Sequence, residues 1–217
     1  MIPPMYHVLD LTHPITPHMP VYPGTEPPVL EQANTVERNG FAETLLRMYS
    51  HTGTHIDAPA HMVGGTAFLD QLPVDRFVGR ACVIDVSSAA GGEVPAHLVE
   101  EQASLIGGCS FVLLHTGWSR FWGDDRYFAG FPVLSAEATA WLVARGLKGV
   151  GFDAISADRV GPPPYPNHIA LFQAGGILIE NRANLGQLVG RTFPFSCLPL
   201  AYERADGSPV RAVGIID

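Results

Sequence analysis

The run HTGTHIDAPAH, from His51 to His61, restricts the local backbone of this chain more than any other stretch. Its imidazole and carboxylate residues all occupy odd-numbered positions: His51, His55, Asp57 and His61. Alternate side chains share one face of a β-strand, whereas on a helix a spacing of six residues turns the side chain well away. Gly53 and Pro59 are also unfavourable in helix interiors, so the run is predicted to be extended. An extended backbone would bring three imidazoles and one carboxylate to the same face.

Four polar side chains on one face need a partner, because burying them without one is costly. A bound metal ion supplies that partner, and histidine together with aspartate suits Zn, Mn, Fe, Ni or Cu better than Ca or Mg. The alternative is a hydrogen-bonded polar strand with surface histidines. The regular spacing favours the metal site over this alternative, but it does not select one metal.

The composition indicates one globular domain that acts on a small molecule. With 217 residues and 47% hydrophobic content, the chain can bury a core as a single domain, residues 1–217. A net charge of -8 argues against nucleic acid or an anionic membrane surface as a partner, since both need basic patches. Because the sequence shows neither a signal-peptide pattern nor an apolar stretch of membrane-spanning length, a cytoplasmic location is expected.

Prolines are predicted to keep much of the N-terminal part free of helices and strands. Tyr6–Thr12 alternates as a β-strand does, and the prolines between Pro14 and Pro28 then prevent regular structure. Tyr22 stands in this loop, where its ring either lies over a ligand pocket or packs within the loop. Beyond the loop, Ala42–Tyr49 is expected to lead into the histidine-rich run.

The middle of the chain alternates between strand and helix patterns. Apolar runs of strand length lie at Arg80–Val86, Ser110–His115 and Gly149–Asp153. Helices are predicted over Pro95–Ile106 and Ser135–Arg145. The alternation predicts an α/β fold: a single domain with a mixed, partly parallel β-sheet and packed helices. His115 and Asp153 end two of the strands, either as hydrogen-bonded turn residues or as support for the site.

The C-terminal part contains a second proline-rich loop and a second histidine-carboxylate pair. After the loop Gly161–Asn167, His168 opens a short predicted helix, and Ile177–Ile179 forms a buried strand that Glu180 follows. On the residues alone, the Glu180 carboxylate either meets solvent or Arg182, or it joins the site.

A hairpin is predicted near the C-terminus. The segments Thr192–Glu203 and Pro209–Ile216 have strand character and flank Asp206-Gly207, a strong turn signal. We interpret this hairpin as scaffold and assign no functional residue to it.

The pattern His-x-Gly-Thr-His-x-Asp-x-Pro-x-His resembles the signature of the cyclase family of metal-dependent hydrolases, which includes bacterial kynurenine formamidase and isatin hydrolase. The resemblance covers nearly the whole chain and implies a swivelling β/β/α-like fold. It implies His51, His55 and Asp57 as metal ligands. It implies His61 as the catalytic group that transfers protons, and a homodimer or higher homo-oligomer as the assembly.

The resemblance also brings in residues from the C-terminal part. In the formamidase a histidine twelve residues before a glutamate completes the metal site, and His168 and Glu180 stand at that spacing. Two divalent ions are thereby implied, with zinc preferred and manganese as the alternative. The first would be bound by His51, His55, Asp57 and Glu180, and the second by Asp57, His168 and Glu180. Tyr22 stands where the formamidase has a tryptophan that contacts substrate, so it is implied as a substrate-binding residue.

This set of residues is suited to hydrolysis. Metal ions lower the pKa of bound water and polarise a carbonyl group, and His61 would carry the protons. The resemblance implies an arylformamidase-like enzyme of tryptophan catabolism that cleaves the amide C–N bond of N-formylkynurenine or a related aryl formamide. Opening of a cyclic amide or a lactone is the alternative within the same chemistry. A metal-dependent lyase or dehydratase, or an inactive metal-binding protein, is the alternative from another class.

Overall fold

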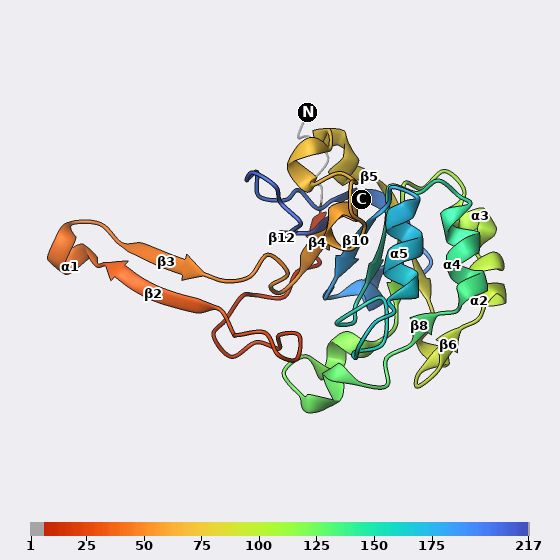
Figure 1. Cartoon of the computed structure of the whole chain (residues 1–217), viewed down its shortest axis with the longest axis horizontal. Coiled ribbons are helices and arrows are strands. Elements are labelled where there is room, and N and C mark those ends of the chain that lie inside the picture. Colours follow the sequence, from red (N-terminus) through yellow and green to blue (C-terminus); the bar gives the residue numbers. More distant parts are fainter. Residues whose placement is uncertain (1–6, 217) are drawn as a thin grey trace.

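The computed structural model describes residues 7–216, and a nine-stranded β-sheet forms its centre (Figure 1). The strand order is β1-β13-β11-β5-β7-β9-β10-β4-β12. The strands of this sheet are β1 His7–Asp10, β4 His55–Asp57, β5 Val78–Asp85, β7 Phe111–His115, β9 Gly149–Phe152, β10 Ile177–Glu180, β11 Thr192–Ser196, β12 Gly207–Pro209 and β13 Val213–Ile216. Of the opening strand predicted over Tyr6–Thr12, Tyr6 lies outside the described residues, and His7–Asp10 forms β1.

Parallel strands occupy the middle of the sheet. The neighbours β5, β7, β9 and β10 run parallel, whereas the strands outside them pair in the antiparallel sense. The helices that lie together on one side of these strands are α2 Ala96–Glu100, α3 Ala103–Ile106, α4 Ala136–Val143 and α5 Pro166–Gln173 (Figure 1). The predicted α/β fold with a mixed, partly parallel sheet and packed helices is therefore confirmed.

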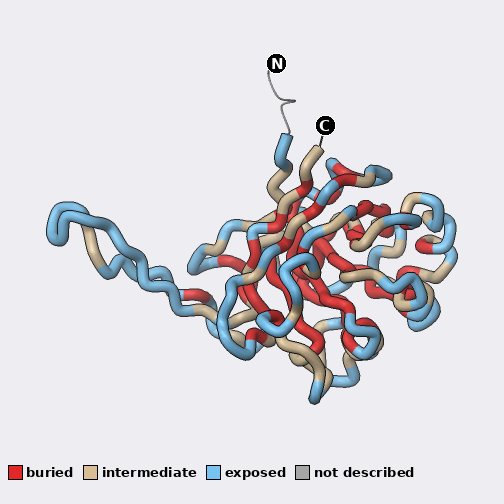
Figure 2. The backbone as a smooth tube through the Cα atoms, turned by 90° about the horizontal axis from the view of Figure 1, so that it is seen from above, coloured by how far each residue is buried: buried red, intermediate tan, exposed pale blue. Residues whose placement is uncertain are grey.

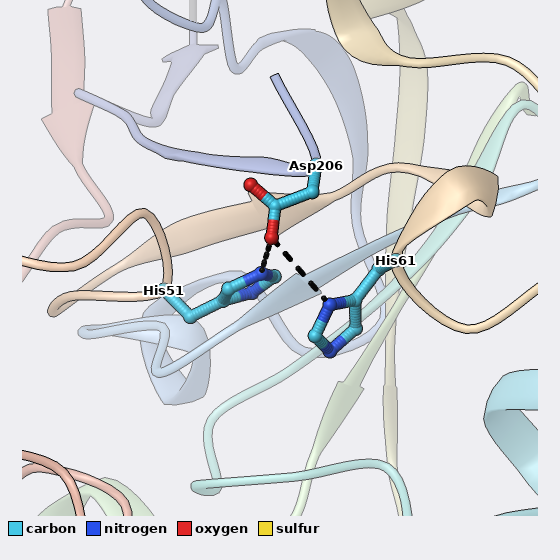
Figure 3. Close-up of side chains that lie close together, drawn as sticks. All are labelled: His51, His61 and Asp206. Carbon is cyan, nitrogen blue, oxygen red and sulfur yellow. Dashed lines mark hydrogen bonds and ion pairs between the residues drawn. The ribbon is translucent and has the colours of Figure 1, made fainter. Parts of the chain in front are cut away.

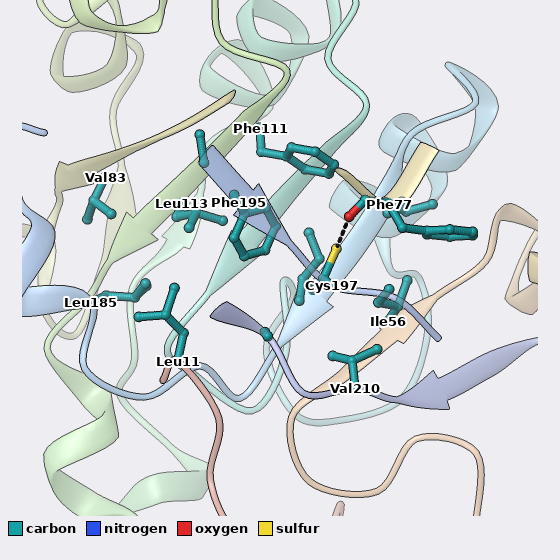
Figure 4. Packing of buried hydrophobic residues seen from close by; sticks show 14 of the residues in the cluster. Leu11, Ile56, Phe77, Val83, Phe111, Leu113, Leu185, Phe195, Cys197 and Val210 are labelled. Carbon is teal, nitrogen blue, oxygen red and sulfur yellow. Dashed lines mark hydrogen bonds between the residues drawn. The ribbon is translucent and has the colours of Figure 1, made fainter. Parts of the chain in front are cut away.

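Side chains of the central strands alternate between two buried clusters. In β5, Cys82 and Ile84 pack with apolar residues of the helices, whereas Ala81 and Val83 belong to the cluster on the other face. In that second cluster, side chains from the parallel strands meet those of β4 and β11, such as Phe195 (Figure 4). Both faces of the parallel strands are thus covered, which explains the apolar runs in their sequences.

A two-stranded arm projects away from the sheet (Figure 1). It consists of β2 (Val29–Asn34) and β3 (Glu43–Arg47), which pair antiparallel, and of the short helix α1 (Val36–Asn39) between them. Figure 2 shows exposed residues along most of its length. The segment Ala42–Tyr49, expected to lead into the histidine-rich run, contains β3, which belongs to the arm and not to the central sheet.

Two predicted helices have different bounds in the structure. The helix predicted over Pro95–Ile106 is divided into α2 and α3, because the backbone leaves helical geometry at Gln102. The helix predicted to open at His168 is α5, which begins at Pro166, where a proline is tolerated in the first turn. Within residues 7–216, none of the helices combines the length and the hydropathy that a membrane span requires.

The helix predicted over Ser135–Arg145 is confirmed as α4. Ser135 caps its first turn, since its hydroxyl oxygen accepts a hydrogen bond from the Ala138 amide. β8 (Val133–Leu134) leads into α4 and pairs in parallel with β6 (Glu93–Val94) as a small separate sheet.

The two segments predicted to form a hairpin do pair antiparallel, with Phe195 opposite Gly214 and Pro199 opposite Val210, but the tight turn predicted at Asp206-Gly207 is wrong. Gly207 begins β12, which pairs with β4, whereas β11 pairs with β13. The Asp-Gly pair signals a turn only from local sequence, and pairing with β4 overrides that signal by placing it at the edge of the sheet. As a result, Asp206 lies beside the residues of the run His51–His61.

The run His51–His61 is not one strand, contrary to the prediction from its odd spacing. Only His55–Asp57 is extended, as β4, because Gly53 adopts a left-handed conformation with φ 65° and Pro59 begins the 3₁₀ helix η1 (Pro59–His61). His51 therefore precedes the strand in a turn, and His61 ends η1. The other 3₁₀ helices are η2 Leu69–Gln71, η3 Val74–Phe77, η4 Ser87–Ala89, η5 Trp118–Phe121, η6 Asp125–Phe128 and η7 Leu185–Leu188.

Candidate active site

A pocket with a volume of about 450 Å³ lies beside β4 and the carboxyl end of β10. It is lined by every residue predicted to bind metal or substrate or to transfer protons: Tyr22, His51, His55, Asp57, His61, His168 and Glu180. Aromatic and apolar side chains, including Tyr49, Met62 and Tyr165, form other parts of its wall. The structure thus brings the predicted residues together, while their chemical roles stay predictions.

The register of the sheet brings two buried carboxylates to the same face of neighbouring strands. β4 runs antiparallel to β10, with His55 opposite Glu180. His55 and Asp57 are two residues apart on β4, so both side chains point to the same face. Asp57 is 1% exposed and Glu180 is 5% exposed. Because isolated buried carboxylates are costly, this pair requires positive charge nearby.

The predicted ligands contact one another directly. Asp57 Oδ1 lies 2.6 Å from His51 Nδ1 and 3.1 Å from His55 Nε2. The two oxygens of Glu180 face different imidazoles, since Oε2 lies 3.7 Å from His55 Nε2 and Oε1 lies 3.3 Å from His168 Nε2. Three groups result, each with donor atoms within 4.8 Å of one another. Two are largely buried and share Asp57, namely His51, His55 and Asp57, and Asp57, His168 and Glu180. The third, His51, His61 and Asp206, is less buried.

The tautomer of His55 leaves a lone pair for a metal. His55 Nδ1 lies 2.8 Å from the carbonyl oxygen of Gly53. A carbonyl oxygen only accepts hydrogen bonds, so Nδ1 donates its proton and Nε2 keeps its lone pair toward Asp57 and Glu180. Metal-binding histidines are held in this way by a hydrogen bond from the second ring nitrogen.

The other two histidines of these groups are held by carboxylates that the sequence analysis does not assign to the site. His168 Nδ1 lies 2.7 Å from Asp158 Oδ2, and His51 Nε2 lies 3.1 Å from Asp206 Oδ2. Asp158 also accepts a hydrogen bond from the His168 amide, which fixes the start of α5. Neither aspartate stands at a ligand-like spacing, because each comes from a segment distant in sequence from the run His51–His61.

The charges of the cluster favour a bound cation. Burial alone would raise the pKa of Asp57, but the imidazoles of His55 and His51 lower it well below its usual value. Burial also opposes protonation of His51 and His168, yet the neighbouring carboxylates raise the pKa of each to about 10. A metal ion can replace these protons, because metal ligands must be deprotonated. The residues therefore fit a first-row transition metal bound by imidazole and carboxylate groups.

His61 lies at the edge of the cluster and belongs to neither buried group (Figure 3). The centre of its ring lies 4.0 Å from that of His51, and its Nδ1 lies 3.8 Å from Asp206 Oδ2. Burial lowers the pKa of His61 to about 4, so its imidazole is neutral at pH 7. Asp206 is ionised there, since the hydrogen bond from His51 lowers its pKa to about 2.

Tyr22 both lines the pocket and packs within its loop. Its hydroxyl accepts a hydrogen bond of 3.4 Å from the Gly161 amide, which joins the two proline-rich loops. The ring also packs against a small buried cluster that includes Ile155. The two interpretations of Tyr22 from the sequence are therefore compatible.

His115 and Asp153 are not among the residues that line the pocket. His115 Nδ1 lies 3.2 Å from Asp153 Oδ2, and Asp153 accepts hydrogen bonds from the amides of Thr116 and Gly117. These contacts are those of hydrogen-bonded turn residues. Arg182 does not pair with Glu180 either, because its buried guanidinium lies over the ring of Phe195 at 4.5 Å.

Known proteins resemble this chain in both sequence and structure. The model of the family described as "Putative cyclase" matches residues 9–159. The kynurenine formamidase of Bacillus cytotoxicus is 32% identical over 206 residues, which cover 94% of this chain and 95% of that protein. A crystal structure of an isatin hydrolase bound to the product analogue thioisatinate has a TM-score of 0.88 and 26% identity, over 97% of this chain and 92% of that chain. A structure described as a potential metal-dependent hydrolase with cyclase activity has a TM-score of 0.81 and 29% identity, over 97% and 98%.

Proposed function

The chain belongs to the cyclase family, and from this premise we propose that it is a metal-dependent hydrolase that cleaves the amide C–N bond of an aryl formamide such as N-formylkynurenine. The relatives named kynurenine formamidase support this choice of bond. The observation that carries the proposal is a pair of ligand groups that share Asp57, next to the neutral imidazole of His61 in one pocket.

Two divalent ions fit the ligand set, with zinc preferred and manganese as the alternative. Glu180 supports a pair of ions because its two oxygens face different histidines, as expected for a bridging carboxylate. The first ion would be held by His51, His55, Asp57 and Glu180, and the second by Asp57, His168 and Glu180. When bound, the ions would polarise the substrate carbonyl and lower the pKa of water.

The residues of the chain itself would move protons and hold the substrate. The neutral imidazole of His61 can take a proton from the attacking water and deliver it to the nitrogen of the departing arylamine. The rings of Tyr22, Tyr49 and Tyr165 line the pocket and offer apolar contact to an aryl group. An aromatic formamide therefore suits the pocket better than an aliphatic one.

A cyclic amide or a lactone is the second candidate substrate, which the similarity to the isatin hydrolase structure favours. Attack of water on a ring carbonyl requires the same residues. The test is a panel of aryl formamides, isatins and lactones in water enriched in oxygen-18, with the metal content measured in parallel. We expect the formamides to react fastest and one solvent oxygen to enter the acid product. An unlabelled product would instead indicate a lyase or dehydratase, and no reaction with any compound would contradict the proposal.

We also propose that the protein assembles as a homodimer or a higher homo-oligomer. The arm supports this, because a two-stranded hairpin without further contacts is at best marginally stable in water. Its apolar residues Phe41, Leu45 and Leu46 are 53%, 57% and 54% exposed. A second copy packed against one face of the arm would bury part of this apolar surface and stabilise the hairpin.

A further inference from the structure

Asp206 and Gly207 lie beside β4, the strand that carries the candidate ligands His55 and Asp57. Gly207 lies opposite Asp57 in the pairing of β12 with β4, and the Ala58 amide donates a hydrogen bond of 2.8 Å to the Asp206 carbonyl oxygen. The hydroxyl of Tyr202 donates to the Gly207 carbonyl oxygen from the other side. The backbone at this position is thus fixed relative to Asp57, although it comes from the far end of the chain.

One carboxylate oxygen of Asp206 faces two pocket histidines (Figure 3). Oδ2 lies 3.1 Å from His51 Nε2 and 3.8 Å from His61 Nδ1. His51 therefore has its two ring nitrogens directed at two different carboxylates, with Nδ1 toward Asp57 and Nε2 toward Asp206. A proton held on Nε2 by Asp206 leaves Nδ1 as the nitrogen that can bind a metal.

Gly207 provides the space in which the His51 ring lies. A Cβ atom added at Gly207 would lie 2.5 Å from His51 Cε1 and 2.7 Å from His51 Nε2, closer than non-bonded atoms approach. Any larger residue would displace the imidazole, whose ring centre lies 4.0 Å from that of His61. Gly207 is not one of the glycines with a positive φ angle, so its backbone conformation does not require glycine. The lack of a side chain at position 207 is instead needed to leave space for the His51 ring.

We propose that Asp206 and Gly207 are positioning residues for the proposed reaction: they hold His51 with Nδ1 toward the metal and orient His61 beside it. Asp206 accepts the Nε2 proton of His51 and attracts the Nδ1 proton of His61, which leaves His61 Nε2 free to accept a proton from water. Gly207 leaves the space in which the His51 ring lies. The role given to His61 rests on the proposed function. The effect of Asp206 and Gly207 on metal binding by His51 does not depend on that function.

The test compares zinc affinity and kinetics for Asp206→Ala, Asp206→Asn and Gly207→Ala. Zinc affinity is measured by competition with a chelating dye, and kcat and KM are measured with the best aryl formamide. We expect Asp206→Ala to bind zinc roughly 10- to 100-fold more weakly, the usual effect of removing a carboxylate behind a metal-bound histidine. We expect kcat to fall while KM changes little. Asp206→Asn should recover part of the affinity, because its amide oxygen can accept the same hydrogen bond.

The matched control is Glu203→Gln, which removes the same charge from an exposed position three residues earlier. It should bind zinc as the unmodified protein does. Gly207→Ala should weaken zinc binding in a protein whose circular dichroism is unchanged, and if it does not fold, the two Asp206 variants still decide the matter. Unchanged zinc affinity in Asp206→Ala, or an Asn variant no better than the Ala variant, would overturn the proposal. Failure of the unmodified protein to hydrolyse any substrate would count against the proposed function alone.

Discussion

Of the pocket histidines that the structure describes, His61 is the one outside both buried ligand groups. A proton-transfer residue can be removed without loss of metal, whereas a ligand cannot. We therefore expect His61→Ala to keep its metal content and to lose about 10²- to 10⁴-fold in kcat, the usual contribution of a general acid or base. Elemental analysis and steady-state kinetics on the same preparation check this. Loss of metal in proportion to activity would make His61 a ligand instead.

Asp57 differs from His51 because it belongs to both buried ligand groups, whereas His51 belongs to only one of these two. Asp57→Asn should therefore lose more metal than His51→Gln, down to none if two ions are bound. Both variants should keep the circular dichroism spectrum of the unmodified protein. Metal content per folded chain is the measurement, and full occupancy in Asp57→Asn would rule out a bridging role for this carboxylate.

Residue types and their spacing were sufficient to bring His51, His55, Asp57 and His61 together, because side chains in one short run must lie near one another. The assignment of His168, Glu180 and Tyr22 to the pocket came from the family resemblance. The same reasoning could not find Asp206 or Asp158. Each is an ordinary polar residue in its local sequence, and Asp206 matches a turn pattern better than any site pattern. Their contacts with His51 and His168 arise only when distant segments pair or pack.

At the level of elements, the parallel strands were the easiest to predict. Their apolar runs, such as Phe111–Leu114, are buried on both faces, so sequence and burial agree. The histidine-rich run was harder, since its odd spacing fits a strand although β4 is short. The turn at Gly53 directs His51 to the pocket, and the 3₁₀ helix that begins at Pro59 directs His61 to the same pocket.

The two proline-rich loops form one wall of the pocket, and Tyr22 connects them. Tyr22→Ala removes both the ring and the hydrogen bond to Gly161, so we expect KM for an aryl substrate to rise about tenfold, the value of one lost aromatic contact. Tyr22→Phe keeps the ring and should show a smaller rise. Metal content should not change in either variant. An unchanged KM in Tyr22→Ala would limit Tyr22 to packing within the loop.

At the level of the whole molecule, the predicted site residues lie on the strands β4 and β10 or on the turns, loops and helices beside them, whereas the arm projects away from the sheet. The arm was not predicted from the sequence, because the polar residues of β2 and the loop prolines before it hide its strand pattern. In the structure its residues are exposed on both faces. Its apolar side chains therefore support the proposed assembly.

The register of the arm predicts which of its faces meets the second copy. Directly opposite residues of an antiparallel pair share a face, so Leu30 and Leu46 form an apolar face, whereas Leu45 lies opposite Glu31 on the other face. A charge buried at an apolar interface is costly, so Leu46→Asp should weaken association at least about tenfold. Leu45→Asp, the matched control on the mixed face, should leave the oligomer intact. Size-exclusion chromatography with light scattering distinguishes these outcomes, and a monomeric unmodified protein, or equal effects of the two changes, would contradict this interface.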